Sequence, residues 1–137
     1  HQNFKSVIDD KGRSSVDGTV IVNEGAQLTS SDQLINNLML SDTAHADTKP
    51  NLMIFADDVK CAHGATVGQI DPDQLFYLKT RGLPEALARE LLTTSFVESL
   101  IAQIPFPEVV CDLESILALC GGARLSGGFG WGLFDGR

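Results

Sequence analysis

The sequence predicts a β-rich fold followed by an α-helical C-terminal part. Short apolar runs broken by turn residues fill the first half of the 137-residue chain, with no helical spacing between them. A capped helix start then follows at Asp71-Pro72-Asp73, and beyond it apolar residues recur every four positions. The change of pattern places the boundary between the two parts near Ile70.

The first half contains several strand-forming segments, which are expected at residues 4–8, 16–22, 38–40 and 52–55. Asp9-Asp10-Lys11-Gly12 and Asn23-Glu24-Gly25 are typical turns, residues 41–50 predict a polar loop, and residues 59–69 suggest tightly turning extended chain. An all-β unit follows from this pattern. A sandwich, a barrel and a β-helix all fit it, and no exact internal repeat separates them.

The second half predicts helices. Asp71 can cap the first helix, Pro72 suits its first position, and Gly82 ends it. A second helix is expected from Pro84 to Ile104. Its wide apolar stripe needs a partner surface, either the β unit or another subunit. The stripe contains Ala88, Leu91, Leu92, Phe96, Val97, Leu100, Ile101 and Ile104.

A third helix is expected at residues 108–120 and should end at Gly121-Gly122. The glycine-rich residues 125–137 predict a flexible tail. Because the chain begins at His1 without methionine, we expect the start of the natural reading frame to be missing. Its first residues lack the features of a signal peptide.

Composition limits the classes of partner. The net charge of −8 and the lack of a basic stripe argue against nucleic acid, and no apolar run is long enough to span a membrane. Cys61, Cys111 and Cys120 form an odd, sparse set that suits a reducing compartment. Cys111 and Cys120 would face opposite ways on one helix.

Cys61 and His63 are the candidate chemical site. Residues two apart in a strand share a face, with Cα atoms about 6.6 Å apart, so a soft sulfur and an imidazole would lie side by side. Such a pair suits iron, zinc or sulfur-transfer chemistry. The alternative is a small buried cysteine beside a structural histidine. Asp57 and Asp58 could act as acid/base or metal-binding carboxylates, but a turn or bulge with solvated carboxylates is favoured for them.

The segments around this pair resemble the C-terminal part of SufD, a subunit family of the SUF iron–sulfur cluster assembly machinery. The resemblance is carried by VKCAHGATVGQID at residues 59–71 and LFYLKTRGL at residues 75–83. It is also carried by GTVIV (18–22), AQLT (26–29), NLMLS (37–41) and PNLMI (50–54). The paralogous SufB family typically has His-Glu-Ala-Thr where this chain has residues 63–66, so SufD is favoured.

The resemblance implies a right-handed parallel β-helix followed by a small helical domain. Residues 1–70 would be the last coils of a truncated β-helix, 71–104 a region that docks the ATPase SufC, and 105–137 a helix and tail without a match. The docking residues would be Leu75, Phe76, Tyr77, Leu92, Phe96 and Leu100. Departures from the family are Met53, where glutamate is common, and the missing N-terminal portion.

The resemblance also implies a function. The chain would be a non-enzymatic scaffold that pairs with SufB and SufC in the cytoplasm, or in the plastid stroma of a photosynthetic eukaryote. Cys61 and His63 would share a transient iron–sulfur cluster with SufB, and no nucleotide would bind to this chain. The alternatives are a β-helical enzyme that uses Asp57, Asp58 and His63, or an inert interaction module.

Overall fold

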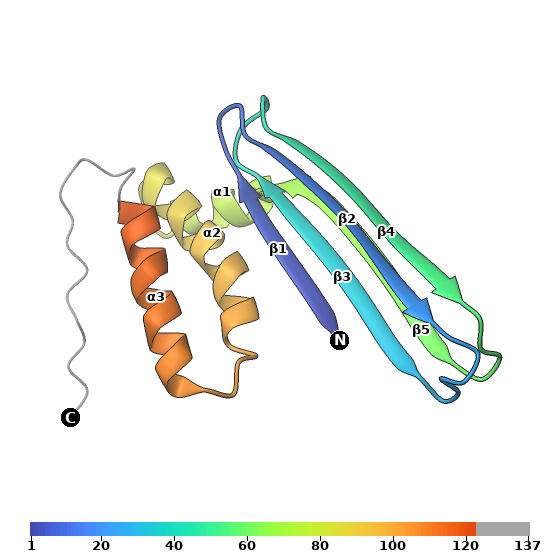
Figure 1. The fold of residues 1–137 in the computed structure, drawn as a ribbon. Helices are drawn as coiled ribbons and strands as arrows, with labels where there is room; N and C mark the ends of the chain where they lie inside the picture. Colours follow the sequence, from blue (N-terminus) through green and yellow to red (C-terminus); the bar gives the residue numbers. More distant parts are fainter. Residues whose placement is uncertain (123–137) are drawn as a thin grey trace. The chain divides into compact units, whose positions relative to one another are not determined.

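The computed structural model describes residues 1–122, with side chains to residue 117, as five strands followed by three helices (Figure 1). His1–Leu100 form one compact unit, and the chain from Ile101 onward belongs to a second. The elements are β1 (Gln2–Ile8), β2 (Arg13–Val22), β3 (Ser30–Met39), β4 (His45–Ile54), β5 (Lys60–Gln69), α1 (Pro72–Thr80), α2 (Glu85–Ile101) and α3 (Pro107–Gly122).

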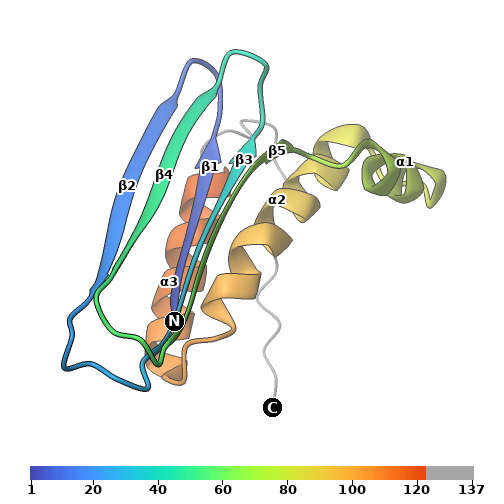
Figure 2. The same cartoon turned by 90° about the vertical axis from the view of Figure 1, so that its right-hand side faces the viewer.

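Successive strands alternate between two parallel sheets, one in the order β1-β3-β5 and the other β2-β4. Gln2 of β1 pairs with Gln33 of β3, and Arg13 of β2 pairs with His45 of β4. Ser31 of β3 pairs in turn with Cys61 of β5. Each strand therefore pairs with the next strand but one along the chain, a regular structural repeat that the sequence does not show. The two sheets lie face to face (Figure 2).

The most deeply buried residues between the sheets come from alternate positions of β3 and from the end of β2. Ile35 of β3 is completely buried, and Val22 at the end of β2 is 3% exposed. Gln33 and Asn37 lie on the same face of β3 as Ile35 and are also buried. The Asn37 Nδ2 atom donates a hydrogen bond of 2.9 Å to Thr48 Oγ1 in the opposite sheet. This interior is therefore partly polar.

Gly18 makes room for one of these buried polar side chains. A Cβ atom at position 18 would lie 2.7 Å from the Nε2 atom of Gln33, far closer than real Cβ contacts. The missing side chain in β2 thus allows the Gln33 amide to lie against the backbone of the opposite sheet.

α2 lies alongside part of the outer face of the β1-β3-β5 sheet (Figure 2), where Leu38 is buried while Val7 and Leu34 stay exposed. Lys5 of β1 donates a hydrogen bond of 2.8 Å to the Phe96 carbonyl and a second one to Ser99 Oγ. The ammonium also lies 4.6 Å from the centroid of the Phe96 ring, a cation–π contact. Ala88 is completely buried on the same helix. Part of the predicted apolar stripe therefore packs within the chain.

Helix α1 begins and ends as predicted. Asp71 is the N-cap and accepts a hydrogen bond of 2.9 Å from the backbone N–H of Asp73, and Pro72 is the first helical residue. Gly82 follows the helix with φ of 90°, a conformation that favours glycine, and its N–H bonds to the Lys79 carbonyl.

The fold confirms a β-rich first part of parallel strands and a helical C-terminal part, but several predicted boundaries are wrong. β3 starts at Ser30 instead of residue 38, because its buried polar side chains conceal the strand pattern. Residues 45–50, predicted as loop, begin β4, whose place at a sheet edge tolerates Pro50.

Two predicted helix ends are also wrong. α2 stops at Ile101 instead of Ile104, and α3 continues through Gly121 and Gly122. The predicted tail at residues 125–137 lies outside the described residues. Within residues 1–122, no helix has the length and apolar content that a membrane crossing requires.

Candidate functional site: a cysteine–histidine pair on an edge strand

β5 places Cys61 and His63 on one face of the β1-β3-β5 sheet. Cys61 is the register partner of Ser31, and His63 is the partner of Gln33. Because side chains of register partners point to the same face, the pair shares the inner face with Gln33. Within residues 1–122, β5 pairs only with β3, so this face ends at an open edge. His63 is exposed and Cys61 is half-buried.

Asp57 and Asp58 do not join this pair on the strand. Both precede β5, which begins at Lys60. The Asp58 carbonyl accepts a hydrogen bond of 2.6 Å from the Leu28 N–H, and its own N–H donates to Gln27 Oε1. This is the turn that the sequence favoured. An acid/base site built on Asp57 and His63 therefore lacks the shared strand face that it would need.

The pair can supply two donors to a metal or one thiol and one imidazole to sulfur chemistry. A cysteine thiolate and a neutral imidazole nitrogen both suit iron. Among the described residues, no third histidine, cysteine, aspartate or glutamate lies close enough to complete a metal-binding group. Two donors leave open coordination positions, so a cluster held here would need ligands from elsewhere.

The structure separates the predicted docking residues into two sets. Phe76 and Tyr77 of α1 are 68% and 56% exposed, whereas Leu75 is half-buried. Leu92 and Phe96 instead line a cavity of about 430 Å³. The cavity also involves the ends of β3 and β5 and the start of α1, with Leu38, Val67, Ile70 and Gln74 among its lining residues. Leu100 is half-buried.

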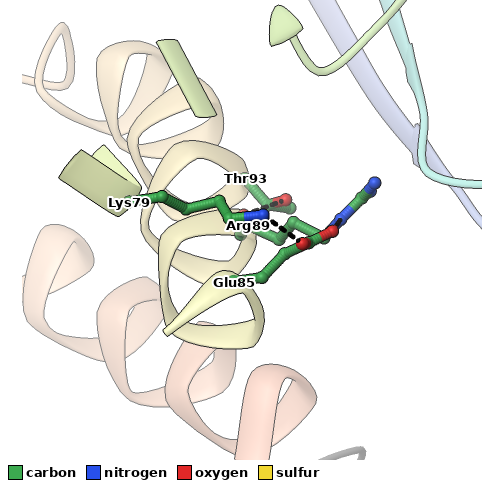
Figure 3. A network of polar contacts seen from close by, with 4 residues as sticks. All are labelled: Lys79, Glu85, Arg89 and Thr93. Atoms are coloured by element: carbon green, nitrogen blue, oxygen red, sulfur yellow. Dashed lines mark hydrogen bonds and ion pairs between the residues drawn. The ribbon is translucent and has the colours of Figure 1, made fainter. Parts of the chain in front are cut away.

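A charged network at the corner between α1 and α2 was not anticipated from the sequence. Figure 3 shows the ammonium of Lys79 directed at the carboxylate of Glu85, at 2.7 Å. Arg89 approaches the other carboxylate oxygen at 3.5 Å, and Thr93 bonds to the Arg89 carbonyl. The four-residue spacing of Glu85 and Arg89 is the signal that could have revealed part of this network.

The network gives Glu85 a distinctive titration. The hydrogen bond and charge of Lys79, and to a lesser degree Arg89, hold the pKa of the Glu85 carboxyl below its ordinary value. Because the pKa is lowered in the folded state, the contacts of Glu85 with Lys79 and Arg89 stabilise the folded protein fully at a pH above the ordinary pKa of glutamate. This stabilisation is lost as the pH falls through the folded-state pKa. Because the group is exposed, salt should weaken the effect.

We therefore expect Lys79→Met to raise the pKa of Glu85 more than Arg89→Met does, because Lys79 makes the shorter contact. The pKa is measured by following the Glu85 side-chain carbonyl in an NMR pH titration at low and high salt. A larger rise in Arg89→Met than in Lys79→Met would contradict the assignment.

The described fold and site define a class of protein: parallel strands that alternate between two sheets, an edge strand that presents a thiol and an imidazole, and a helical extension. The family model described as the SufBD core domain of SUF-system FeS cluster assembly matches residues 1–96. The chain therefore belongs to the SufBD family of the SUF iron–sulfur cluster assembly system.

Curated relatives agree with this family. An iron–sulfur cluster assembly SufBD family protein of Synechocystis is 41% identical over 90% of this chain and 26% of its own length. SufD of Escherichia coli is 43% identical over 72% of the chain and 23% of its own length. The chloroplastic protein ABCI7 of Arabidopsis thaliana is 44% identical over 72% and 21%. The chain thus spans about a quarter of the length of these relatives.

Proposed function

We propose that this chain is the C-terminal part of a SufD-like scaffold subunit, which is not itself an enzyme. It would pair with a SufB-like subunit and dock a SufC-like ATPase. The observation that carries the proposal is the placement of Cys61 and His63 together on the open edge strand of a SufBD core domain. An edge strand can join its site to groups of a second chain, which two donors alone require.

The alternating strands support a finer fold assignment within the proposal. Residues 1–70 would be the last coils of a right-handed parallel β-helix, because each successive turn of the chain adds one strand to each sheet. The handedness is expected because connections between parallel strands of one sheet are almost always right-handed. Residues 71–104 would form the helical docking region, and residues 105–137 a further helix and tail.

The iron–sulfur cluster would be the cargo of the complex and would be shared transiently with the SufB-like subunit. The thiolate of Cys61 would either bind iron or attack the outer sulfur of a donor persulfide, whose inner sulfur then leaves as a thiolate. A ring nitrogen of His63 would bind iron or carry a proton. ATP would bind to the SufC-like partner and not to this chain. The bacterial and chloroplastic relatives support a cytoplasmic or stromal location for this role.

The exposed aromatic residues of α1 support the docking part of the proposal. Phe76 and Tyr77 present large apolar surfaces, and the Tyr77 ring is stacked by Arg81, whose guanidinium lies 5.2 Å from its centroid. Aromatic and arginine side chains of this kind often dominate the free energy of binding at protein interfaces.

The proposal is tested by co-expressing the tagged full-length subunit with SufB-like and SufC-like subunits and measuring which of them co-purify. Both should be retained by the unchanged protein. The double variant Phe76→Ala/Tyr77→Ala should keep the SufB-like subunit and lose the SufC-like one, with affinity lowered roughly thirtyfold.

Ile21→Ala provides the control, because Ile21 is 59% exposed on the outer face of β2. This variant should leave both partners bound. Failure of the unchanged protein to retain either subunit would contradict the scaffold role. A complex that retains both subunits but forms no cluster, and in which the Cys61 thiol is unreactive, would favour the inert interaction module.

A further inference from the structure

Gln33 has a buried side-chain amide that is only partly hydrogen-bonded. It lies in the central strand β3 and is 3% exposed. Its Nε2 atom donates a hydrogen bond of 3.1 Å to Gln2 Oε1 in β1. Its Oε1 atom is buried and has no hydrogen-bond partner among the described residues. A buried carbonyl oxygen without a donor is uncommon in native proteins and calls for an explanation.

The sheet register shows which residue can supply the missing donor. Gln2, Gln33 and His63 are successive register partners across β1, β3 and β5, and their side chains share the inner face. Since Nε2 is bonded to Gln2 in β1, Oε1 is the part of the amide left to accept a donor from β5 on the other side. Neighbouring strands lie about 4.8 Å apart, within the reach of an imidazole and an amide side chain.

The opposite sheet holds the amide in this orientation. The backbone at Gly18 approaches Nε2 so closely that a Cβ atom would lie only 2.7 Å from it. The Gln33 side chain is thus confined between Gly18 on one side and its own sheet on the other. His63, in contrast, is exposed on the edge strand and free of such confinement, so its imidazole can rotate toward the fixed oxygen.

We infer that Gln33 is the positioning residue for His63: its Oε1 atom accepts the N–H of one ring nitrogen and so fixes the tautomer and orientation of the imidazole. The other ring nitrogen then carries its lone pair toward the open edge, where it can bind iron or take up a proton. A hydrogen bond of this kind commonly orients a metal-binding histidine. The inference rests on the proposed function for the role of the free nitrogen only.

Asn37 gives a matched comparison on the same strand. It is equally buried, and its Oδ1 atom also has no hydrogen-bond partner among the described residues. Its Nδ2 atom is bonded to Thr48 Oγ1 and the Thr66 carbonyl. Its register partner in β5 is Val67, which has no side-chain donor. Removing the Asn37 amide should therefore disturb the interior without changing His63.

The test measures the tautomer of His63 in the 137-residue chain by ¹⁵N NMR, at a fixed pH where the imidazole is neutral. The signal is assigned by its loss in His63→Ala. One tautomer should dominate in the unchanged chain, and Gln33→Met, which keeps the side-chain length, should shift the ratio roughly fivefold toward that of a free histidine peptide. Gln33→Glu, which keeps an acceptor, should retain the dominant tautomer.

Asn37→Leu should leave the tautomer ratio unchanged. Gly18→Ala provides a second perturbation, because its Cβ displaces the amide while Gln33 is kept, and it should shift the ratio in the same direction as Gln33→Met. An unchanged ratio in both Gln33→Met and Gly18→Ala, or an equal shift in Asn37→Leu, would overturn the inference.

The result does not depend on partner subunits or on cluster formation. Failure of the proposed function would appear separately, as normal cluster yield in His63→Ala while the tautomer of His63 still follows Gln33.

Discussion

Replacement of His63 by alanine in the full-length subunit is expected to lower the yield of assembled cluster by at least roughly tenfold while the complex stays intact. Disturbing even the hydrogen-bonding surroundings of a metal-binding histidine commonly costs roughly 10–100-fold in affinity or activity, and the variant removes the nitrogen itself. Because His63 is an exposed residue on an edge strand, its truncation should leave the core packing unchanged.

The cluster yield is measured by absorbance and by iron and sulfide content after reconstitution of the purified complex, with subunit stoichiometry determined on the same sample. His45→Ala is the matched control. His45 is an exposed histidine at the start of β4, and its Nε2 atom lies 3.4 Å from Asp47. The complex that carries His45→Ala should form clusters normally. Normal cluster yield in His63→Ala would remove His63 from the site.

The largest effect on stability is expected from Ile35→Ala. Ile35 is completely buried between the two sheets, in the central strand of the three-stranded sheet. Truncation removes its apolar contacts and leaves a cavity that the paired strands on both sides prevent from collapsing. Substitutions of this type lower the free energy of unfolding by about 2–5 kcal/mol. This is a large part of the total stability of a small domain.

The free energy of unfolding is measured by urea denaturation followed by circular dichroism. Ile21→Ala is the control of identical chemistry, since Ile21 lies on the outer face of β2 and is 59% exposed. Its effect should stay within about 0.5 kcal/mol. If both variants lose the same stability, the two-sheet interior does not contain the main core of this unit.

The sequence predicted the helices better than the strands, for a local reason. The cap at Asp71, the proline at position 72 and the glycine at position 82 act within one turn of helix, so they are readable without any tertiary contact. The sequence does not reveal the start of β3, because Gln33 and Asn37 occupy core positions that are usually apolar in a strand. The opposite sheet accommodates both side chains, because Gly18 leaves room for Gln33 and Thr48 accepts a hydrogen bond from Asn37.

Part of the candidate site was also predictable. The two-residue spacing of Cys61 and His63 places them on one strand face wherever that strand lies, and residues 60–69 do form a strand. The spacing could not show that this strand ends the sheet, or that Gln33, a distant residue in the sequence, is the neighbour of His63. The register between distant segments depends on the packing of the whole unit, so it cannot be deduced from the sequence of one strand alone.

The amino-acid sequence alone is enough to establish the class of structure, the helix limits near Asp71 and Gly82, and the family, through the segments around Cys61. These properties depend on local chemistry and on residue identity. Tertiary packing, in contrast, sets the alternation of strands between two parallel sheets and the buried amide on the register partner of His63. It also decides that Phe96 is half-buried and lines the cavity while Phe76 is exposed. Those properties arise from contacts between residues far apart in the chain, which local patterns do not encode.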